Sequence, residues 1–305
     1  KTEFFLRFMK IGERRVNDYI VGGRTQSQNV RGFACVTTGV VRDACRQHGA
    51  SPTAAAALGR ALTAGALLGA LLSDGQRVAL KFEGNGPLKK ILVEADSAGV
   101  VRGYVGAPQA ELPLKQGKID VAGAIGHAGF LTVTKDLRLK QPYKGVVQLY
   151  TSEIAEDVAF YLTESEQIPS AVGVGVLLEH SGDIAVAGGF LIQSLPPSDE
   201  QVIAALVRRI EELPPLTDIF QQQSPEAVLR LVFHDMPFDI TTTHPLAFKC
   251  TCTKARVERA LVSLGAEELT AIIREQDEIE AHCEFCRASY RFTLQELSRL
   301  LASIQ

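Results

Sequence analysis

The chain has 305 residues, of which 46% are hydrophobic and 22% are charged, and its formal net charge at pH 7 is -3. This composition is ordinary for a globular protein, and the length allows more than one hydrophobic core. The small net charge argues against a protein that binds nucleic acid or anionic membranes through its overall charge.

The N-terminal residues do not resemble a secretory signal. Arg7 interrupts a short apolar run, and no small-residue cleavage site follows it. We expect residues 1–16 to be an N-terminal extension, and Met9 is an alternative start that would leave the first eight residues outside the native chain. Without an export signal we expect a cytoplasmic protein, in which thiols stay reduced.

Residues 17–195 combine helix and strand patterns and are predicted to form one α+β domain with a mixed sheet-and-helix core. Ser51, Pro52 and Thr53 are typical of a helix start, and an Ala/Leu/Gly run follows. Residues 54–72 are nearly long enough to span a membrane, but Arg60 lies within them, so we expect a buried helix of a globular domain. Another helix is expected at 153–164. Strands are expected at 77–84, 89–95, 100–106, 129–137, 145–151, 171–179 and 183–193.

Residues 196–248 are predicted to be a helical linker. Two proline pairs, at 196–197 and 214–215, separate short amphipathic segments. Such helices cannot bury their own apolar faces and must lie on another surface. We therefore expect this linker to be weakly held against its neighbours.

Residues 249–305 are predicted to form a small C-terminal unit. Two helices are expected first, near 254–264 and around Leu269, followed by a hairpin with a C-x-x-C motif at its turn. Thr293 and Glu296 have the spacing of a capping box that opens the last helix.

This unit contains four cysteines, Cys250 and Cys252 as C-x-C, and Cys283 and Cys286 as C-x-x-C. Clustered cysteines in a cytosolic protein indicate metal or redox chemistry, and zinc prefers four tetrahedral sulfur or nitrogen ligands. We predict that the four thiolates bind one zinc ion in the reduced state. The alternatives are four small buried apolar side chains or static disulfides. Replacement of a sulfur ligand by His244 or His282 is disfavoured because four cysteines are available.

The metal would dominate the stability of this unit. Fifty-seven residues form a marginal core, whereas a structural zinc contributes roughly 10–16 kcal/mol at neutral pH. Losing zinc should therefore unfold the unit. The same thiolates react with oxidants. The positive charges of the flanking Lys249, Lys254 and Arg287 are expected to favour the thiolate form over the thiol. Four cysteines allow three disulfide pairings. The closeness of the sulfurs within each half-site favours neighbour pairing, although a C-x-C bridge closes a strained ring.

The remaining chain shows no catalytic pattern. Cys35 and Cys45 stand alone in the first domain and are predicted to be buried apolar side chains. No G-x-x-x-x-G-K-[ST] phosphate loop is present, and no linked nucleophile, base and orienting group is recognisable. We therefore do not expect an enzyme.

With these motifs, the chain resembles the heat shock protein 33 family of redox-regulated molecular chaperones, also called 33 kDa chaperonins. The resemblance covers nearly everything after about residue 17. Its most specific element is the cysteine spacing. Further matches are the segments SPTAAAALGRALTAGALLGALL, FEGNGPLKKILVEAD, YKGVVQLYTSEIAEDVAFYLTESEQIPSAV and HDMPF.

The resemblance implies an ATP-independent holdase that protects unfolding client proteins during oxidative stress. In the reduced, inactive form, Cys250, Cys252, Cys283 and Cys286 would bind zinc. Oxidation would form the disulfides Cys250–Cys252 and Cys283–Cys286, release zinc, unfold the C-terminal unit and destabilise the linker. The active form would be a homodimer that binds clients, with no nucleic-acid or membrane partner.

Two other classes of protein are compatible with four zinc ligands. A zinc-ribbon protein that binds nucleic acid is the first alternative, but residues 249–305 contain eight basic and nine acidic side chains, and phosphate binding needs concentrated Lys or Arg. An enzyme with a purely structural zinc is the second, and a deep pocket lined by histidine and carboxylate in the first domain would favour it.

Overall fold

The computed structural model describes residues 17–275 and 278–304. The chain divides into two compact units, residues 1–248 and residues 249–305. The first unit has two hydrophobic clusters and the second has a small cluster of its own. Sheets and helices occur in both units, so the predicted α+β class is confirmed.

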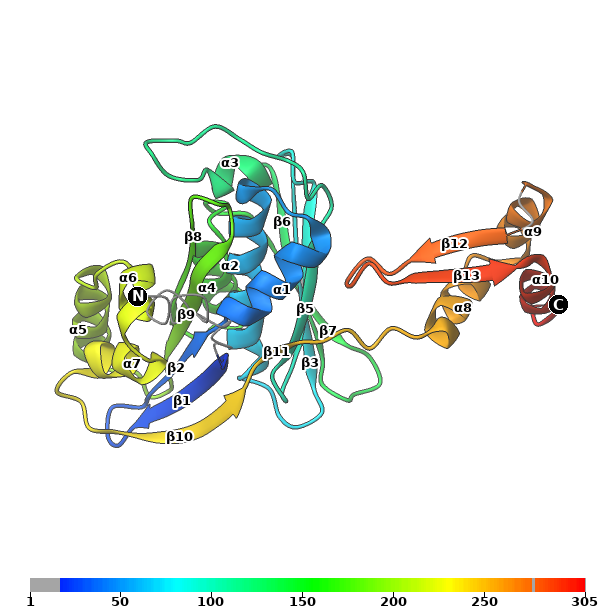
Figure 1. The fold of residues 1–305 in the computed structure, drawn as a ribbon. Helices are drawn as coiled ribbons and strands as arrows, with labels where there is room; N and C mark the ends of the chain where they lie inside the picture. The colour runs from blue at the N-terminus through cyan, green and yellow to red at the C-terminus, as the bar shows by residue number, and fades with distance from the viewer. Residues whose placement is uncertain (1–16, 276–277, 305) are drawn as a thin grey trace, which may run out of the picture. The chain divides into compact units, whose positions relative to one another are not determined.

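A five-stranded antiparallel sheet joins segments from both ends of the first unit (Figure 1). Its order is β10-β1-β2-β9-β8. The strands are β1 (Tyr19–Thr25), β2 (Val30–Val36), β8 (Ser170–Leu178), β9 (Ile184–Ser194) and β10 (Phe238–Pro245). The pairing of Tyr19 with Pro245 places the end of the predicted linker in this sheet, next to the first strand.

A six-stranded sheet forms the other side of the first unit, in the order β11-β5-β4-β3-β6-β7. Its strands are β3 (Arg77–Gly84), β4 (Lys90–Asp96), β5 (Val100–Val105), β6 (Gly129–Asp136), β7 (Tyr143–Gln148) and β11 (Ala247–Phe248). Only the pairing of β11 with β5 is parallel. The seven strands predicted between residues 77 and 193 are thus confirmed within a few residues.

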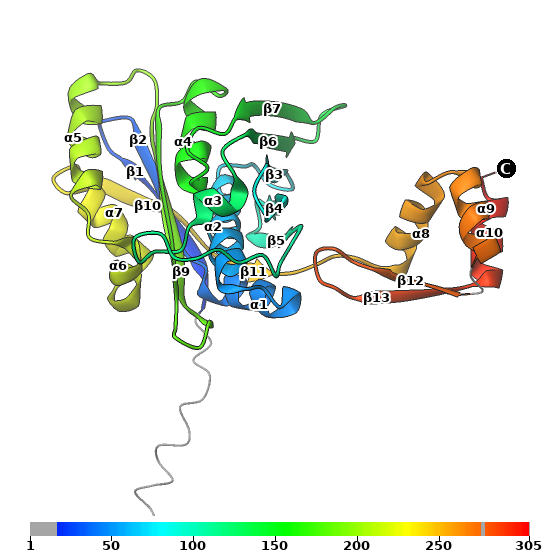
Figure 2. The ribbon, with the colours of Figure 1, turned by 90° about the horizontal axis from the view of Figure 1, so that it is seen from above.

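Helix α2 (Pro52–Gly69) is the central element of the first unit and packs against strands of both sheets (Figure 2). Ser51 caps it by accepting a hydrogen bond from the Ala54 amide at 3.2 Å. Small residues allow this close packing: a Cβ on Gly65 would lie 2.5 Å from a methyl group of Val93. The expected buried helix is therefore confirmed, and none of the described helices is long and apolar enough to cross a membrane.

Three further helices pack beside α2 in the first unit. They are α1 (Thr38–His48), α3 (Val121–Ile125) and α4 (Ile154–Glu164). Arg60 on α2 forms an ion pair with Glu153 at the start of α4, which explains how a charge is tolerated in the central helix.

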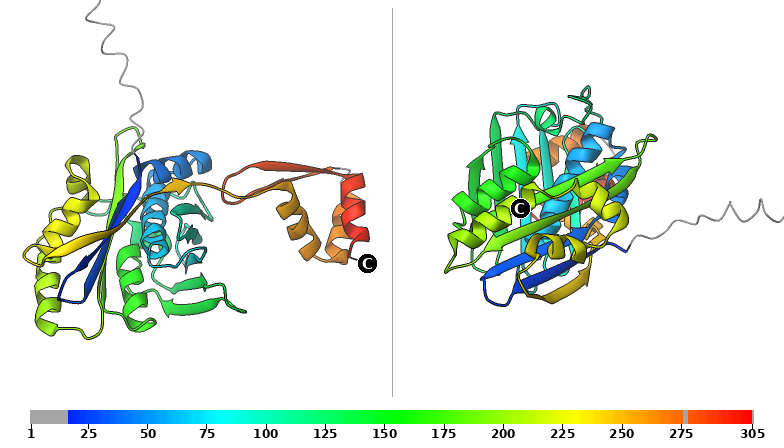
Figure 3. Two further views of the ribbon diagram at one scale, coloured as in Figure 1. Left: turned by 90° about the horizontal axis from the view of Figure 1, so that it is seen from below. Right: turned by 90° about the vertical axis from the view of Figure 1, so that its left-hand side faces the viewer.

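The helices of the predicted linker cover the other face of the five-stranded sheet (Figure 3). They are α5 (Glu200–Glu211), α6 (Leu216–Gln222) and α7 (Pro225–Phe233). Leu229 and Phe233 of α7 lie against Gly32 of β2, and Phe220 of α6 lies against Gly188 of β9. Sequence analysis expected helices alone in this region, whereas β10 and β11 also belong to it.

The second unit consists of three helices and a two-stranded hairpin. Its elements are α8 (Lys254–Ser263), α9 (Ala266–Glu275), β12 (Glu278–His282), β13 (Ser289–Thr293) and α10 (Leu294–Ala302). The predicted capping box is present, because the Thr293 side chain and Glu296 exchange hydrogen bonds with each other's backbone amides. The buried side chains of its core are those of Leu261, Leu269, Phe292 and Leu297.

Candidate metal centre

The first pair of cysteines lies in the short segment that precedes α8. Thr253 caps this helix, and its hydroxyl accepts a hydrogen bond from the Arg256 amide at 3.3 Å. The cap orients the chain directly after Cys252. The C-x-C half-site is therefore held at the start of a helix.

The second pair lies in the turn between β12 and β13. The Cys283 amide donates to the Ala288 carbonyl at 2.9 Å, and the Arg287 amide donates to the Cys283 carbonyl at 2.8 Å. Arg287 has a φ of 57°, the left-handed conformation that closes this turn. The predicted position of the C-x-x-C motif at a hairpin turn is confirmed.

The fold brings the four sulfurs together. All four lie within 4.8 Å of one another. The Cys250 and Cys283 sulfurs are 3.7 Å apart, and those of Cys252 and Cys286 are 3.2 Å apart. Tetrahedral zinc with bonds of about 2.3 Å would separate its sulfur ligands by about 3.8 Å. The four thiols thus form a donor set that can hold a metal ion and that fits zinc.

The two histidines considered as replacement ligands are not members of this cluster. The Nδ1 atom of His282 is 2.9 Å from the Ser289 hydroxyl, on the other strand of the hairpin. His244 belongs to β10 in the first unit.

A side chain that sequence analysis missed contacts the cluster. The Tyr290 hydroxyl, on β13, donates a hydrogen bond to the Cys252 sulfur at 3.1 Å. The hairpin pairs Tyr290 with Ala281, and this register fixes its place next to the C-x-x-C turn. The sequence feature that could have predicted this contact is an aromatic residue in a predicted strand, four positions after Cys286.

The sulfurs have different acidities. Burial raises the pKa of the Cys252 thiol, but hydrogen bonds from Tyr290 and from the other three cysteines outweigh this effect and lower the pKa to about 7. Burial raises the pKa of Cys283 and of Cys286. Lys254, which was expected to favour the thiolates, instead places its Nζ 2.6 Å from a carboxylate oxygen of Glu296. Compared with Cys283 and Cys286, Cys252 is therefore the cysteine whose anionic form its neighbours stabilise more.

Cys35 and Cys45 are separate from the cluster and buried, as predicted. Burial raises the pKa of Cys35, and it raises the pKa of Cys45 to about 12. Both thiols are thus poor nucleophiles at neutral pH.

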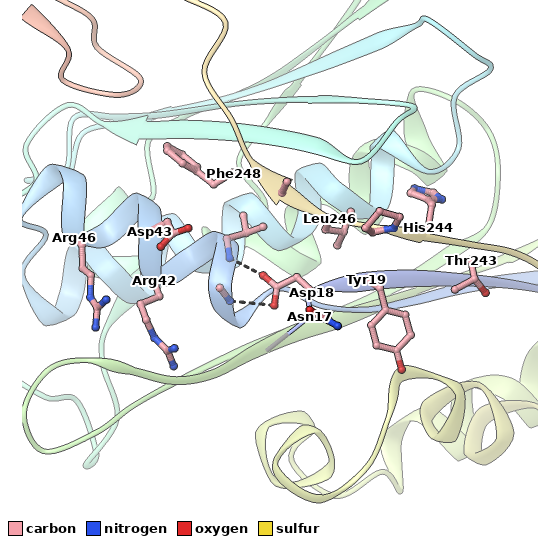
Figure 4. A pocket seen from close by; sticks show the side chains of 14 residues that line it. Asn17, Asp18, Tyr19, Arg42, Asp43, Arg46, Thr243, His244, Leu246 and Phe248 are labelled. Carbon is pink, nitrogen blue, oxygen red and sulfur yellow. Dashed lines mark hydrogen bonds between the residues drawn. The ribbon is translucent and has the colours of Figure 1, made fainter. Parts of the chain in front are cut away.

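A cavity of about 1080 Å³ in the first unit contains the histidine and carboxylates that an enzyme would require (Figure 4). Asp18 is buried there, and its two carboxylate oxygens accept hydrogen bonds from the Gly39 and Val40 amides at 3.0 and 2.6 Å. His244 and Asp18 lie on different parts of the wall. Asp18 thus caps the first turn of α1, which is a structural role.

Comparison with known proteins then identifies the family. The sequence model described as Hsp33 protein matches residues 18–293. The 33 kDa chaperonin of Geobacter sulfurreducens is 56% identical over 96% of this chain and 97% of its own length. The chain belongs to the Hsp33 family. The crystal structure of the Hsp33 homologue from Thermotoga maritima has a TM-score of 0.86 and 36% identity, and the match covers 94% of this chain and 98% of that one.

Membership of the Hsp33 family confirms the resemblance drawn from the cysteine spacing and favours the chaperone interpretation over the zinc-ribbon alternative. The 33 kDa chaperonin of Caldanaerobacter subterraneus is 41% identical over 94% of this chain. The cysteine cluster of this Hsp33 chain is compatible with a redox-switch zinc site.

Proposed function

We propose that this protein is an ATP-independent holdase that is inactive when reduced and activated by oxidation. In the reduced form, Cys250, Cys252, Cys283 and Cys286 hold one zinc ion, which supplies a cross-link between the α8 segment and the hairpin. The active form is a homodimer that binds unfolding client proteins in the cytoplasm. The name that its relatives bear, 33 kDa chaperonin, supports client binding.

The single observation that supports this proposal most strongly is the assembly of four thiols in a unit with a small core. The sulfurs lie within 4.8 Å of one another. The buried core of the same unit consists of four side chains among the described residues. The four sulfurs connect the hairpin to the start of α8, so a chemical change at the sulfurs acts directly on this connection.

The switch is the oxidation of these thiols to disulfides. For each disulfide, two thiols lose two electrons and two protons to hydrogen peroxide, which becomes two molecules of water. Every sulfur is within reach of the others, so the pairing Cys250–Cys252 and Cys283–Cys286 stays a prediction from the family resemblance. Disulfide sulfurs are poor zinc ligands, and oxidation thus removes the cross-link.

The surface offered to clients is expected to come from the linker. Helices α5–α7 cover apolar side chains of the five-stranded sheet, among them Val186, Phe190 and Ile192. Release of these helices after the C-terminal unit unfolds would expose an apolar surface of the kind that binds unfolded chains. The Val207 side chain on α5 is 46% exposed before any release.

The test compares the wild-type protein with a Cys283→Ser variant and with a Cys45→Ser control. We expect hydrogen peroxide with mild heating to release one zinc per wild-type chain and to switch on suppression of client aggregation. The Cys45→Ser protein should respond like the wild type, whereas Cys283→Ser should lack stable zinc before oxidation. Retained zinc and unchanged client aggregation after complete oxidation would contradict the proposal. Peptide mapping of the oxidised protein tests the disulfide pairing.

A further inference from the structure

Strand β7 forms a free edge of the six-stranded sheet in the first unit (Figure 2). It pairs with β6 on one side, and no other described strand pairs with it. Just after β7, the Leu149 amide donates to the Gly129 carbonyl of β6 at 3.0 Å. Backbone groups of an antiparallel strand alternate in direction, so the amides and carbonyls of Lys144, Val146 and Gln148 point away from β6. These groups are available to a further strand.

The outer face of the sheet beside this edge has exposed apolar side chains. Thr132 pairs with Val146 and Phe130 pairs with Gln148, so these four side chains share one face. Val146 is 51% exposed and its diagonal neighbour Phe130 is 54% exposed. Leu131, which lies between Phe130 and Thr132 on β6, points to the other side and is fully buried. An added strand could cover Val146, because side chains directly opposite each other have Cβ atoms about 4.5–5.5 Å apart.

The charge beside this edge is positive. Residues 137–148 contain Arg138, Lys140 and Lys144 and no Asp or Glu. Lys140 and Lys144 are exposed, and neither forms an ion pair among the described residues. A second copy of the edge would bring like charges together, and lysine on an edge strand discourages such pairing. Charge complementarity therefore favours an acidic partner.

Strand β7 is held in place by α4 and by the turn that joins them. A Cβ at Gly145 would lie 2.7 Å from a ring atom of Tyr161, so glycine allows β7 to lie this close to α4. The Asp157 carboxylate of α4 accepts hydrogen bonds from the Tyr150 and Thr151 amides at 2.8 and 3.1 Å. All of these residues belong to the first unit, whereas the four clustered cysteines belong to the second. The edge should therefore keep its shape in both redox states.

We propose that the edge of β7 binds an extended segment of another protein, which adds a strand to the sheet and carries acidic and apolar side chains. Main-chain hydrogen bonds to a sheet edge require an extended peptide, and the side chains beside the edge select its sequence. Since side chains two positions apart share a face, the segment should place an acidic residue opposite Lys144 and an apolar residue opposite Val146. This interaction goes beyond the holdase activity, because it needs neither oxidation nor release of the linker.

The test uses the full-length, reduced, zinc-loaded protein and a fluorescein-labelled peptide, Thr-Glu-Thr-Val-Thr-Glu-Thr, with both ends blocked. The symmetric pattern of the peptide allows either strand direction. Fluorescence anisotropy should show saturable binding that weakens with added salt. Lys144→Glu should weaken binding at least about threefold. Lys118→Glu makes the same charge change at an exposed residue of the loop before α3 and should leave binding unchanged.

Two further changes test the main-chain hydrogen bonds. Val146→Pro removes an amide that points away from β6, so the pairing of β6 with β7 is retained while the docking edge is blocked. We expect its affinity for the peptide to fall at least about tenfold. N-methylation of alternate peptide amides leaves the protein unchanged, and it tests the same hydrogen bonds even where Val146→Pro fails to fold. Methylation in one of the two alternating registers should abolish binding, and methylation in the other should be tolerated.

Four results would overturn the inference. The first is the absence of saturable binding at up to about 1 mM peptide. The second is equal affinity of the parent peptide and both methylated peptides. The third is binding by the oxidised protein alone, which would place the peptide on the released linker surface. The fourth is a dimer of the reduced protein that Val146→Pro dissociates, with no peptide binding, since the edge would then pair with a second copy.

These results are independent of the proposed redox function. Zinc release and client aggregation are measured without this peptide. Peptide binding by a reduced protein that never protects clients would support the edge of β7 as a docking surface and defeat the holdase. Client protection without peptide binding would do the reverse.

Discussion

Removal of the metal from the reduced protein is expected to unfold residues 249–305 while residues 17–248 stay folded. Four side chains form the buried core of the described part of this unit. Burial of each contributes about 2 kcal/mol, or on the order of 8 kcal/mol together. A structural zinc contributes roughly 10–16 kcal/mol at neutral pH. The free energy lost when zinc is removed is therefore larger than the free energy gained by burying these four side chains.

Amide hydrogen exchange of the reduced protein, with and without a strong chelator, measures this effect. We expect the amides of β12, β13 and α10 to lose their protection in the chelated sample. Amides of α2 and β9, which belong to the first unit, should keep theirs. Re-addition of zinc should restore the original pattern, and a Cys35→Ala control should behave like the wild type. Full protection of the hairpin in metal-free, reduced protein would refute the reasoning.

Three further changes test the packing and the charges of the described residues. Leu297→Ala removes a side chain with no exposed surface from the core of the second unit. It should destabilise that unit by about 2–5 kcal/mol, seen as faster amide exchange in α10 with one zinc still bound. Arg209 donates to the Val232 and Phe233 carbonyls at 3.3 and 2.9 Å. Arg209→Ala should lower the stability of the α5–α7 layer by about 1–3 kcal/mol and speed its limited proteolysis. Burial raises the pKa of Asp18 from 3.8 to about 6, so the folded state binds its proton more tightly than the unfolded state. The resulting stabilisation is fully present below about pH 4 and is lost as the pH rises through 6. It amounts to at most about 3 kcal/mol and should be absent from the denaturant midpoints of Asp18→Asn between pH 4 and 7.

Each of these predictions has a control and a contrary result. The Asp235 side chain pairs with Arg209 but is 72% exposed, so Asp235→Ala should change proteolysis little. Equal effects of Arg209→Ala and Asp235→Ala would show that the carbonyl contacts are unimportant. Unchanged exchange in α10 of Leu297→Ala, or equal pH profiles for Asp18→Asn and the wild type, would contradict the other two predictions.

Local sequence signals determined much of this protein. The capping residues Ser51 and Thr293 begin helices where their neighbours predicted, and the alternating segments between residues 77 and 193 form strands. The two cysteine pairs indicated both the metal cluster and the family. These features were predictable because a cap, a turn or an alternating pattern depends on residues within a few positions of one another.

Contacts between distant segments required the tertiary structure. The pairing of β1 with β10 joins residues more than 200 positions apart, and neither strand was predicted. The contact between Tyr290 and the Cys252 sulfur was likewise missed, as was the pairing of Lys254 with Glu296. Whether two distant segments meet depends on which faces are buried together and on the register of the strands, and a sequence pattern of a few residues does not specify either.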